Sequence, residues 1–383
     1  MVRIAHLADT HLGYKQYNLE EREKDIYEVL EEIGDKILEE HADLVIHSGD
    51  LFDSPRPTTQ AYYAFKRFLK RLEGKKFFAV LGDHDKPKAR GMPPHKLFDD
   101  QIQTLGAAGV PEHQQIVVNG KNVLVVGISH LSRTYRQVLV EELKKLERLK
   151  TQCDCNILVL HEAIDKFFPF EDAYEIALTE LPKTFRYYAM GHLHARIKAS
   201  YGQGELAYPG SSEIIRSDEI ASWNKIGKGF YIVDINGEEV EVTGVNLERI
   251  RPQMEFRINY AHFKDELKEL VNDLGRGGKL PIVHVEVEGR DIDRQNVHQV
   301  LSNALTGKVL TFRQTVVEED EMELPELKAG AFHINQILKD YFKDEEIALL
   351  AIEMLKLLRQ DDMDGAKSIA DAYFQKLTKV GKK

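Results

Sequence analysis

Residues 43–52, DLVIHSGDLF, decide the fold of this chain. Residues 44–46 form a short apolar run, which predicts a buried strand that Ser48 and Gly49 bring to an end. Asp50 follows where the strand runs out into a loop, and the glycine lets the backbone turn sharply enough for its carboxylate to point into a shared site. Ligands of open α/β sheets gather at the carboxyl ends of strands, so Asp50 is a candidate site residue.

Four further stretches supply Asp or His side chains. They are DTH at 9–11, GDHD at 82–85, His161, and GHLH at 191–194. Three of these stretches also follow apolar runs. Together with Asp50 they indicate one site for a hard cation.

Length and composition set wide bounds. A chain of 383 residues, 43% of them hydrophobic, is long enough for two or three domains with a sizeable core. No apolar run reaches the roughly 18 residues of a membrane span, and the N-terminus lacks the apolar region of a signal peptide. Cys153 and Cys155 are too few for a disulfide framework, so we expect reduced thiols in a cytosolic protein. The net charge of −11 argues against nucleic-acid binding by the whole surface, while a local basic rim stays open.

The apolar pattern begins as alternating strands and helices and then turns antiparallel. We expect a helix after residue 18 with Asn18 and Glu21 as a capping box, and a hairpin at Asn119-Gly120. Strands are expected at 3–8, 43–47, 77–81, 156–160 and 187–190, helices at 59–72, 94–105 and 133–150, and a meander of strands at 197–201, 206–208, 230–234 and 240–245. This order predicts an α/β (α+β) fold with two sheets packed face to face and helices outside, an α/β/β/α sandwich of four layers.

Four segments are expected along the chain. Residues 1–250 form the main domain, and Arg251-Pro252 marks its end. Residues 251–316 form a small β-α-β-α-β accessory domain, residues 317–330 an acidic linker, and residues 331–383 a helical segment. Within that last segment Asp344 and Asp364 are expected to be helix N-caps.

The constellation suits two divalent metals about 3.5–4 Å apart, which can clamp the oxygens of a phosphoryl group. Asp50 is the natural bridging carboxylate. The expected ligands of one metal are Asp9, His11 and His194, and those of the other are Asp83, His161 and His192. Mixed imidazole and carboxylate donors suit Mn, Fe or Zn better than Mg or Ca. A hydroxide between the metals then attacks, and His84 contacts the phosphoryl group or acts as general acid.

The order D-x-H, G-D, G-x-H, H, G-H-x-H resembles the calcineurin-like metallophosphoesterases. The stretches HLADTHLGYKQYN, HSGDLFDSPRP, YYAMGHLHAR and AYPGSSEI are similar to the DNA double-strand-break repair nuclease of the meiotic recombination eleven family, close to archaeal forms and related to bacterial SbcD. The resemblance implies a manganese-dependent double-strand exonuclease and single-strand endonuclease with two Mn²⁺ per subunit. It also implies an accessory domain that caps DNA, a homodimer, and a coiled-coil SbcC-like ATPase partner bound by the C-terminal helices. The expected location is cytoplasmic, in association with the nucleoid.

Surface residues for these partners are expected at two places. The candidates for DNA contact are Lys15, Arg56, Lys86, Lys88 and Arg90, since phosphate contacts are usually Lys and Arg near the chemistry; a solvated turn is the alternative for the basic loop after His84. The candidates for the dimer interface are Tyr62, Phe65, Leu97, Phe98 and Leu105, whose alternative place is against the sheets.

The chain departs from the family pattern at Asp83, where the third motif usually carries Asn. This carboxylate adds negative charge beside Asp9 and Asp50. Some family members also have His where Asp53 stands. Two other functions stay open: a small-molecule phosphodiesterase or phosphatase of the same fold, and a DNA-end scaffold with weakened catalysis. There is no G-x-x-x-x-G-K-[ST] run, so ATP chemistry would belong to a partner.

Overall fold

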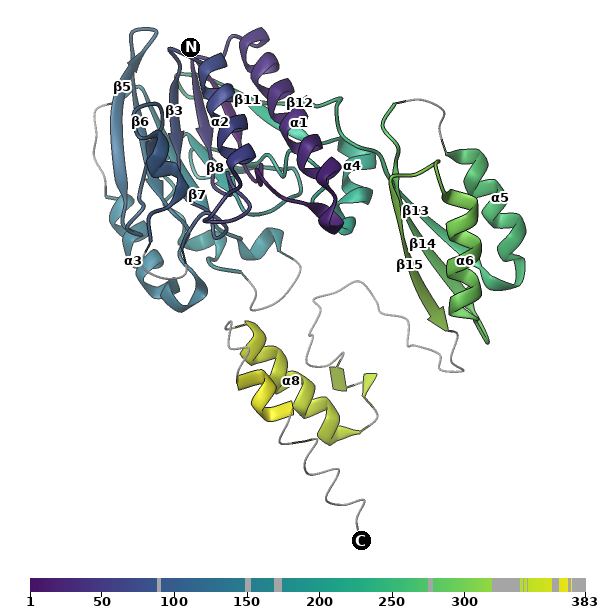
Figure 1. Cartoon of the computed structure of the whole chain (residues 1–383). Coiled ribbons are helices and arrows are strands. Elements are labelled where there is room, and N and C mark those ends of the chain that lie inside the picture. Colours follow the sequence, from purple (N-terminus) through teal and green to yellow (C-terminus); the bar gives the residue numbers. More distant parts are fainter. Residues whose placement is uncertain are drawn as a thin grey trace. The chain divides into compact units, whose positions relative to one another are not determined.

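The computed structural model describes residues 1–87, 91–148, 153–168, 174–274 and 278–318, together with residues 338–339, 341–342, 344–359, 365–370 and 373. The chain has two compact units. One comprises Met1–His130, Lys150–His161 and Lys183–Glu326, and the other comprises Leu131–Leu149, Glu162–Pro182 and Leu327–Lys383. Figure 1 labels their helices and strands.

The first unit contains a six-stranded sheet that begins at the N-terminus. Its strands are β1 (Val2–Leu7), β2 (Leu44–His47), β3 (Lys76–Ala79), β4 (Gln103–Thr104), β11 (Gly229–Asn236) and β12 (Glu239–Asn246), in the order β12-β11-β1-β2-β3-β4. Strands β1 to β4 run parallel, and β11 and β12 extend the sheet in antiparallel fashion from β1. Helices α1 (Glu20–Glu39) and α2 (Thr59–Arg71) pack on one face (Figure 1).

A second six-stranded sheet packs against the first. Its strands are β5 (Glu112–Val118), β6 (Lys121–Ile128), β7 (Cys155–His161), β8 (Tyr187–Gly191), β9 (Ile197–Tyr201) and β10 (Gly204–Tyr208), in the order β5-β6-β7-β8-β10-β9. Strands β6, β7, β8 and β10 run parallel, and the edge strands β5 and β9 are antiparallel to their neighbours.

One hydrophobic core joins the two sheets. Leu44 and Ile46 of β2 belong to the same cluster as Val125 and Val159 of the second sheet. Val45, between them, belongs instead to the cluster that contains α1 and α2. This alternation follows from the two-residue period of a strand. The predicted α/β fold with two sheets packed face to face is confirmed, and α1 and α2 form one outer layer.

A three-stranded parallel sheet follows in the same unit. Its elements are β13 (Gln253–Asn259), α5 (Phe263–Asp273), β14 (Ile282–Gly289), α6 (Arg294–Leu305) and β15 (Thr311–Glu318), and they share a hydrophobic core of their own. Arg251, just before β13, forms two hydrogen bonds of 2.5 and 2.9 Å with the carboxylate of Asp25 in α1. The guanidinium of Arg313 lies 5.0 Å from the centre of the Tyr17 ring.

The second unit contains α3 (Arg136–Leu146) and α8 (Glu345–Arg359). Asp344 Oδ1 accepts hydrogen bonds from the backbone N–H groups of Glu346 (2.9 Å) and Ile347 (3.3 Å), so the predicted N-cap is confirmed. Asp364 and residues 319–330 lie outside the described residues. Within the described part of the chain, no helix is both long and apolar enough to cross a bilayer.

Three local predictions are wrong. Helix α1 begins after Leu19, because Asn18 lies one residue too early and has a left-handed backbone with φ 60°. The helix expected over 94–105 is only the 3-10 turn Pro94–Phe98, because residues 103 and 104 pair with β3 as strand β4. The expected meander is divided: β9 and β10 form a hairpin in the second sheet, whereas β11 and β12 form one in the first, since the chain crosses between the sheets through α4 (Ile220–Ile226).

Candidate metal centre

The five predicted stretches meet where parallel strands of both sheets end. Strands β1, β2 and β3 end beside one another in the first sheet, and β7 and β8 end beside one another in the second. The backbone N–H of Asp9 donates to the carbonyl of Gly49, and the N–H of His11 donates to the carbonyl of Asp50, both at 3.0 Å. Backbone hydrogen bonds therefore hold the loops after β1 and β2 together.

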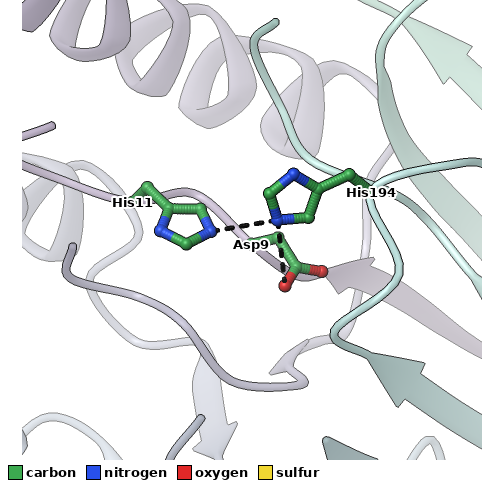
Figure 2. Close-up of side chains that lie close together, drawn as sticks. All are labelled: Asp9, His11 and His194. Carbon is green, nitrogen blue, oxygen red and sulfur yellow. Dashed lines mark hydrogen bonds and ion pairs between the residues drawn. The ribbon is translucent and has the colours of Figure 1, made fainter. Parts of the chain in front are cut away.

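Asp9, His11 and His194 form the first group of side chains (Figure 2). The Nε2 atoms of the two histidines lie 3.2 Å apart, and His194 Nε2 lies 4.0 Å from Asp9 Oδ1. Asp9 also accepts hydrogen bonds from the backbone N–H of His192, at 3.1 and 3.2 Å. Two imidazole nitrogens and a buried carboxylate thus converge on one point.

Asp83, His161 and His192 form the second group. Asp83 Oδ1 lies 3.2 Å from His161 Nε2 and 3.4 Å from His192 Nδ1. In both groups the potential donor atoms lie within 4.8 Å of one another. The structure brings together all the side chains that the sequence analysis assigned to each metal.

Asp50 lies between the two groups. Its Oδ2 atom is 3.7 Å from His11 Nε2 and 3.4 Å from His161 Nε2, while its Oδ1 atom accepts a 3.0 Å hydrogen bond from the backbone N–H of His84. One carboxylate oxygen therefore faces a histidine of each group.

The backbone at these residues is strained. Asp9, His11, Asp50 and His192 have φ angles of 50°, 44°, 53° and 92°, in the left-handed region that costs a non-glycine residue roughly 1–3 kcal/mol. An extended backbone therefore does not bring the side chains of Asp9 and His11 together. The side chains converge because the loop coils after β1, and such strain is typical of functional sites.

Close packing of the loops requires glycine at two positions. A Cβ atom on Gly82 would lie 2.0 Å from Asp50 Oδ1, and one on Gly191 would lie 2.0 Å from the carbonyl oxygen of Ser48. Only a residue without a side chain allows the strand ends to approach this closely.

Asp85 holds two of the loops in place. Its buried carboxylate accepts hydrogen bonds from the backbone N–H groups of Leu51 (3.2 Å), Phe52 (2.9 Å) and Gly82 (3.0 Å). The sequence analysis quoted this residue but assigned it no role. Its place in the GDHD stretch, two residues after Asp83, is the signal that would have found it.

The ionisable groups of the site strongly shift one another's pKa values. Burial lowers the pKa of His11, but the facing carboxylates of Asp53, Asp50 and Asp9 outweigh burial and raise it to about 9. Burial likewise opposes the charge of His161, yet Asp50 and Asp83 raise its pKa well above the usual value. In return, His161 holds the pKa of both carboxyls well below their usual range, against the effect of burial. The carboxylates therefore attract positive charge to this site.

The donor set fits a divalent transition metal. Each group offers carboxylate oxygen and imidazole nitrogen in a largely buried setting, and the carboxylates provide negative charge for a cation to neutralise. The Nδ1 atom of His161 lies 2.7 Å from the Ser48 carbonyl, which can only accept, so one ring proton lies on Nδ1. Loss of the other proton would leave the Nε2 lone pair facing Asp50 and Asp83.

His84 lies at the rim of the site, with its side chain 44% exposed. Its Nδ1 atom lies 2.9 Å from the carbonyl oxygen of Asp53, and its ring meets the His11 ring edge to face at 4.8 Å. The side chain is thus oriented and still open to a substrate.

Of the candidate DNA contacts, Arg56 is exposed, whereas the other two described residues have partners within the chain. Lys15 Nζ lies 3.0 Å from Glu23 Oε2, and Lys86 Nζ donates to the carbonyl of His130. Lys88 and Arg90 lie outside the described residues.

The candidate dimer residues divide by burial. Phe65, Phe98 and Leu105 are buried in the core of this chain, so their assignment to an interface is wrong. Phe65 and Phe98 pack in the core beneath α2, whereas Leu105 packs in the core between the two sheets, so all three occupy the alternative place that the sequence left open. Tyr62 is partly buried, and Leu97 is 55% exposed.

Residues 2–196 match the family model of the calcineurin-like phosphoesterases. With that match and the site above, the chain is a metal-dependent phosphoesterase, as the order of its motifs predicts. Within this class it belongs to the family of the DNA double-strand break repair protein Mre11, and it is a nuclease of DNA double-strand break repair.

Three archaeal relatives with that name carry the assignment. The chain is 34% identical to the protein of Saccharolobus solfataricus, over 99% of this chain and 100% of the relative. It is 33% identical to that of Thermoplasma acidophilum (94% and 95% covered) and 32% identical to that of Methanocaldococcus jannaschii (97% and 98% covered). These matches favour neither a small-molecule phosphodiesterase or phosphatase nor a DNA-end scaffold with weakened catalysis.

Proposed function

We propose that the chain cleaves DNA with two Mn²⁺ ions per subunit. Asp9, His11 and His194 would hold one ion, and Asp83, His161 and His192 the other. Asp50 would be shared. The observation that carries this proposal is the position of Asp50 Oδ2, which faces His11 at 3.7 Å and His161 at 3.4 Å.

Two such cations, when bound, supply a polarised phosphoryl group and an activated water. The chain's own side chains do the rest. The Asp85 carboxylate holds the backbone of the Asp50 loop against Gly82. His84, held at Nδ1 by the Asp53 carbonyl, contacts the phosphoryl group or protonates the leaving oxygen through its other ring nitrogen.

The proposal also covers the three-stranded sheet, the C-terminal helical segment and a dimer. We retain the division into residues 1–250, 251–316, 317–330 and 331–383, with the second segment as a DNA-capping domain and the last as a ligand for a coiled-coil SbcC-like ATPase. The activities are double-strand exonuclease and single-strand endonuclease. Of the candidate DNA contacts that the structure describes, Arg56 is exposed and can contact DNA without losing an ion pair or hydrogen bond of its side chain within the chain.

The test is cleavage of single-stranded and double-stranded DNA by the purified chain. Each reaction contains EDTA or one of Mn²⁺, Mg²⁺, Zn²⁺ and Fe²⁺. We expect cleavage of both substrates with Mn²⁺ and none with EDTA. Cleavage with Mg²⁺ that exceeds cleavage with Mn²⁺ would overturn the choice of metal. Absence of cleavage with every cation would overturn the proposal itself.

A further inference from the structure

A carboxylate lies directly behind one histidine of the first group. His194 Nδ1 lies 2.7 Å from Oε1 of Glu219, a residue at the end of the 3-10 turn Ser217–Glu219. A carboxylate can only accept, so the imidazole proton lies on Nδ1. The Nε2 atom then carries a lone pair and faces His11 and Asp9.

Glu219 is itself fixed by buried partners. Its Oε2 atom accepts from Lys228 Nζ and lies 2.7 Å from Ser211 Oγ, and its Oε1 atom accepts a 3.0 Å hydrogen bond from the backbone N–H of Arg216. Glu219, Lys228 and Ser211 are all buried. Both carboxylate oxygens are thus held, and the charge is neutralised inside the protein.

The same lysine also holds the backbone of His194. Lys228 Nζ donates to the His194 carbonyl at 2.9 Å. The ring of His194 is therefore attached at its Nδ1 atom through Glu219 and at its backbone through Lys228. A rotation of the ring would have to break a buried hydrogen bond to a charged group.

One histidine of the second group has a different kind of acceptor behind it. His161 donates its Nδ1 proton to the Ser48 carbonyl, a neutral acceptor, at 2.7 Å. In the first group, His11 Nδ1 lies 3.3 Å from a further carboxylate, Asp53. An outer carboxylate strengthens metal binding by the histidine it orients, so Glu219 should strengthen cation binding by His194.

We propose that Glu219, neutralised by Lys228, is a positioning residue that strengthens cation binding by the first group. It does so by fixing the ring and the tautomer of His194, and it touches neither metal nor substrate. The proposal rests on the two-metal centre proposed above.

Mn²⁺ titration calorimetry on the full chain tests this, with four proteins compared. Glu219→Met with Lys228→Met removes the ion pair as a unit. Such apolar replacements leave stability nearly unchanged, and Ser211 keeps the carbonyl of Glu213 as a partner at 2.9 Å. Glu219→Gln with Lys228→Met also removes both charges but leaves an acceptor for His194. The control, Arg3→Met with Asp234→Asn, removes a 2.8 Å ion pair of the same unit away from the site.

The wild type and the control should bind two Mn²⁺ with the same pair of affinities. In the double methionine variant one of the two affinities should fall about 10- to 100-fold with the other unchanged, and the glutamine variant should regain part of that loss. Wild-type affinity in a folded double methionine variant would overturn the inference, and so would equal losses in the two double variants of Glu219. If circular dichroism shows that the double methionine variant does not fold, the glutamine variant serves as the test. Wild-type Mn²⁺ affinity in that variant, where Glu219 and Lys228 are both replaced, would contradict a role for the charge. A wild type that fails to bind two Mn²⁺ contradicts the proposed function instead.

Discussion

Oδ2 of Asp50 and Nε2 of His161 lie 3.4 Å apart, although one residue follows β2 of the first sheet and the other ends β7 of the second. The site therefore exists only where the two sheets meet at their carboxyl ends. Each sheet by itself carries part of the donor set. This arrangement makes Asp50 the residue on which both groups depend.

Asp50→Ala should abolish DNA cleavage at saturating Mn²⁺ while the chain stays folded. The substitution removes the carboxylate that both groups face, and it relieves repulsion from Asp83 rather than opening the core. Cleavage of single-stranded DNA and a circular-dichroism melt measure the two effects. Asp234→Asn serves as the control carboxylate outside the site. Full activity in a folded Asp50→Ala protein would contradict the two-metal centre.

Asp83→Asn should raise activity at saturating Mn²⁺ and weaken Mn²⁺ affinity. The Asp83 carboxylate adds a negative charge to a site that already has Asp9 and Asp50, so it strengthens cation binding and repels the phosphate of the substrate. An amide keeps an oxygen near His161 and His192 without that charge. The measurements are a Mn²⁺ titration and the turnover rate of DNA cleavage. If neither the affinity nor the turnover rate changes, the prediction is wrong.

The metal-free chain should lose stability as pH rises from about 6.5 to 9. His11 has a pKa of about 9 in the folded chain, above its ordinary value of 6.5. A raised histidine pKa stabilises the fold fully below the unfolded value, and the contribution disappears as pH passes the folded value. The difference corresponds to roughly 3 kcal/mol at most.

Thermal melts in EDTA across this pH range measure the loss. Mn²⁺ should reverse the trend, because the metal must displace the protons of the histidines and binds better as they leave. His11→Gln should flatten the slope in EDTA. A melting temperature in EDTA that does not depend on pH would show that His11 is not protonated in the folded chain.

Leu97→Glu should convert a dimer into monomers in light scattering. Leu97 is 55% exposed and Tyr63 on α2 is 65% exposed, so an apolar surface remains after the core is filled. Burying the same patch on both subunits is the usual twofold solution. Leu280→Glu, at a 44% exposed leucine of the accessory domain, is the control. A dimer that persists in Leu97→Glu places the interface elsewhere, whereas a charge at buried Phe98 would only unfold the chain.

Deleting residues 331–383 should leave Mn²⁺-dependent cleavage of single-stranded DNA intact and greatly weaken binding to the coiled-coil ATPase. Helix α8 exposes Leu349 and Leu358, which suit a groove or coiled coil on a partner. In the intact chain, Leu349→Glu with Leu358→Glu should reproduce the binding loss. Glu353→Ala, on the same helix, should not. Pull-down at wild-type affinity after the deletion would show that the main contact lies elsewhere.

Most strands and the residues that meet at the candidate site were predictable from the sequence for one physical reason. An apolar run followed by Gly or Asp marks a buried strand and its end, and parallel strands bring their carboxyl ends to one edge. Residues 197–201 were predicted with the observed bounds of β9. Boundaries controlled by distant contacts were missed. The short strand β4 exists because β3 offers its edge, which no local pattern in residues 94–105 reveals.

The sequence by itself determined which Asp and His residues make up the candidate site, because Asp and His at strand ends are a local signal. Only the tertiary structure decided how they are held. Glu219 reaches His194, and Asp85 reaches the backbone of Leu51 and Phe52, through hydrogen bonds between segments 25 or more residues apart. The left-handed backbone at Asp9 and His11 also depends on the hydrogen bonds of their loop to residues 49 and 50. Such contacts form only when the chain is packed, since burial fixes both partners and excludes the water that would otherwise compete.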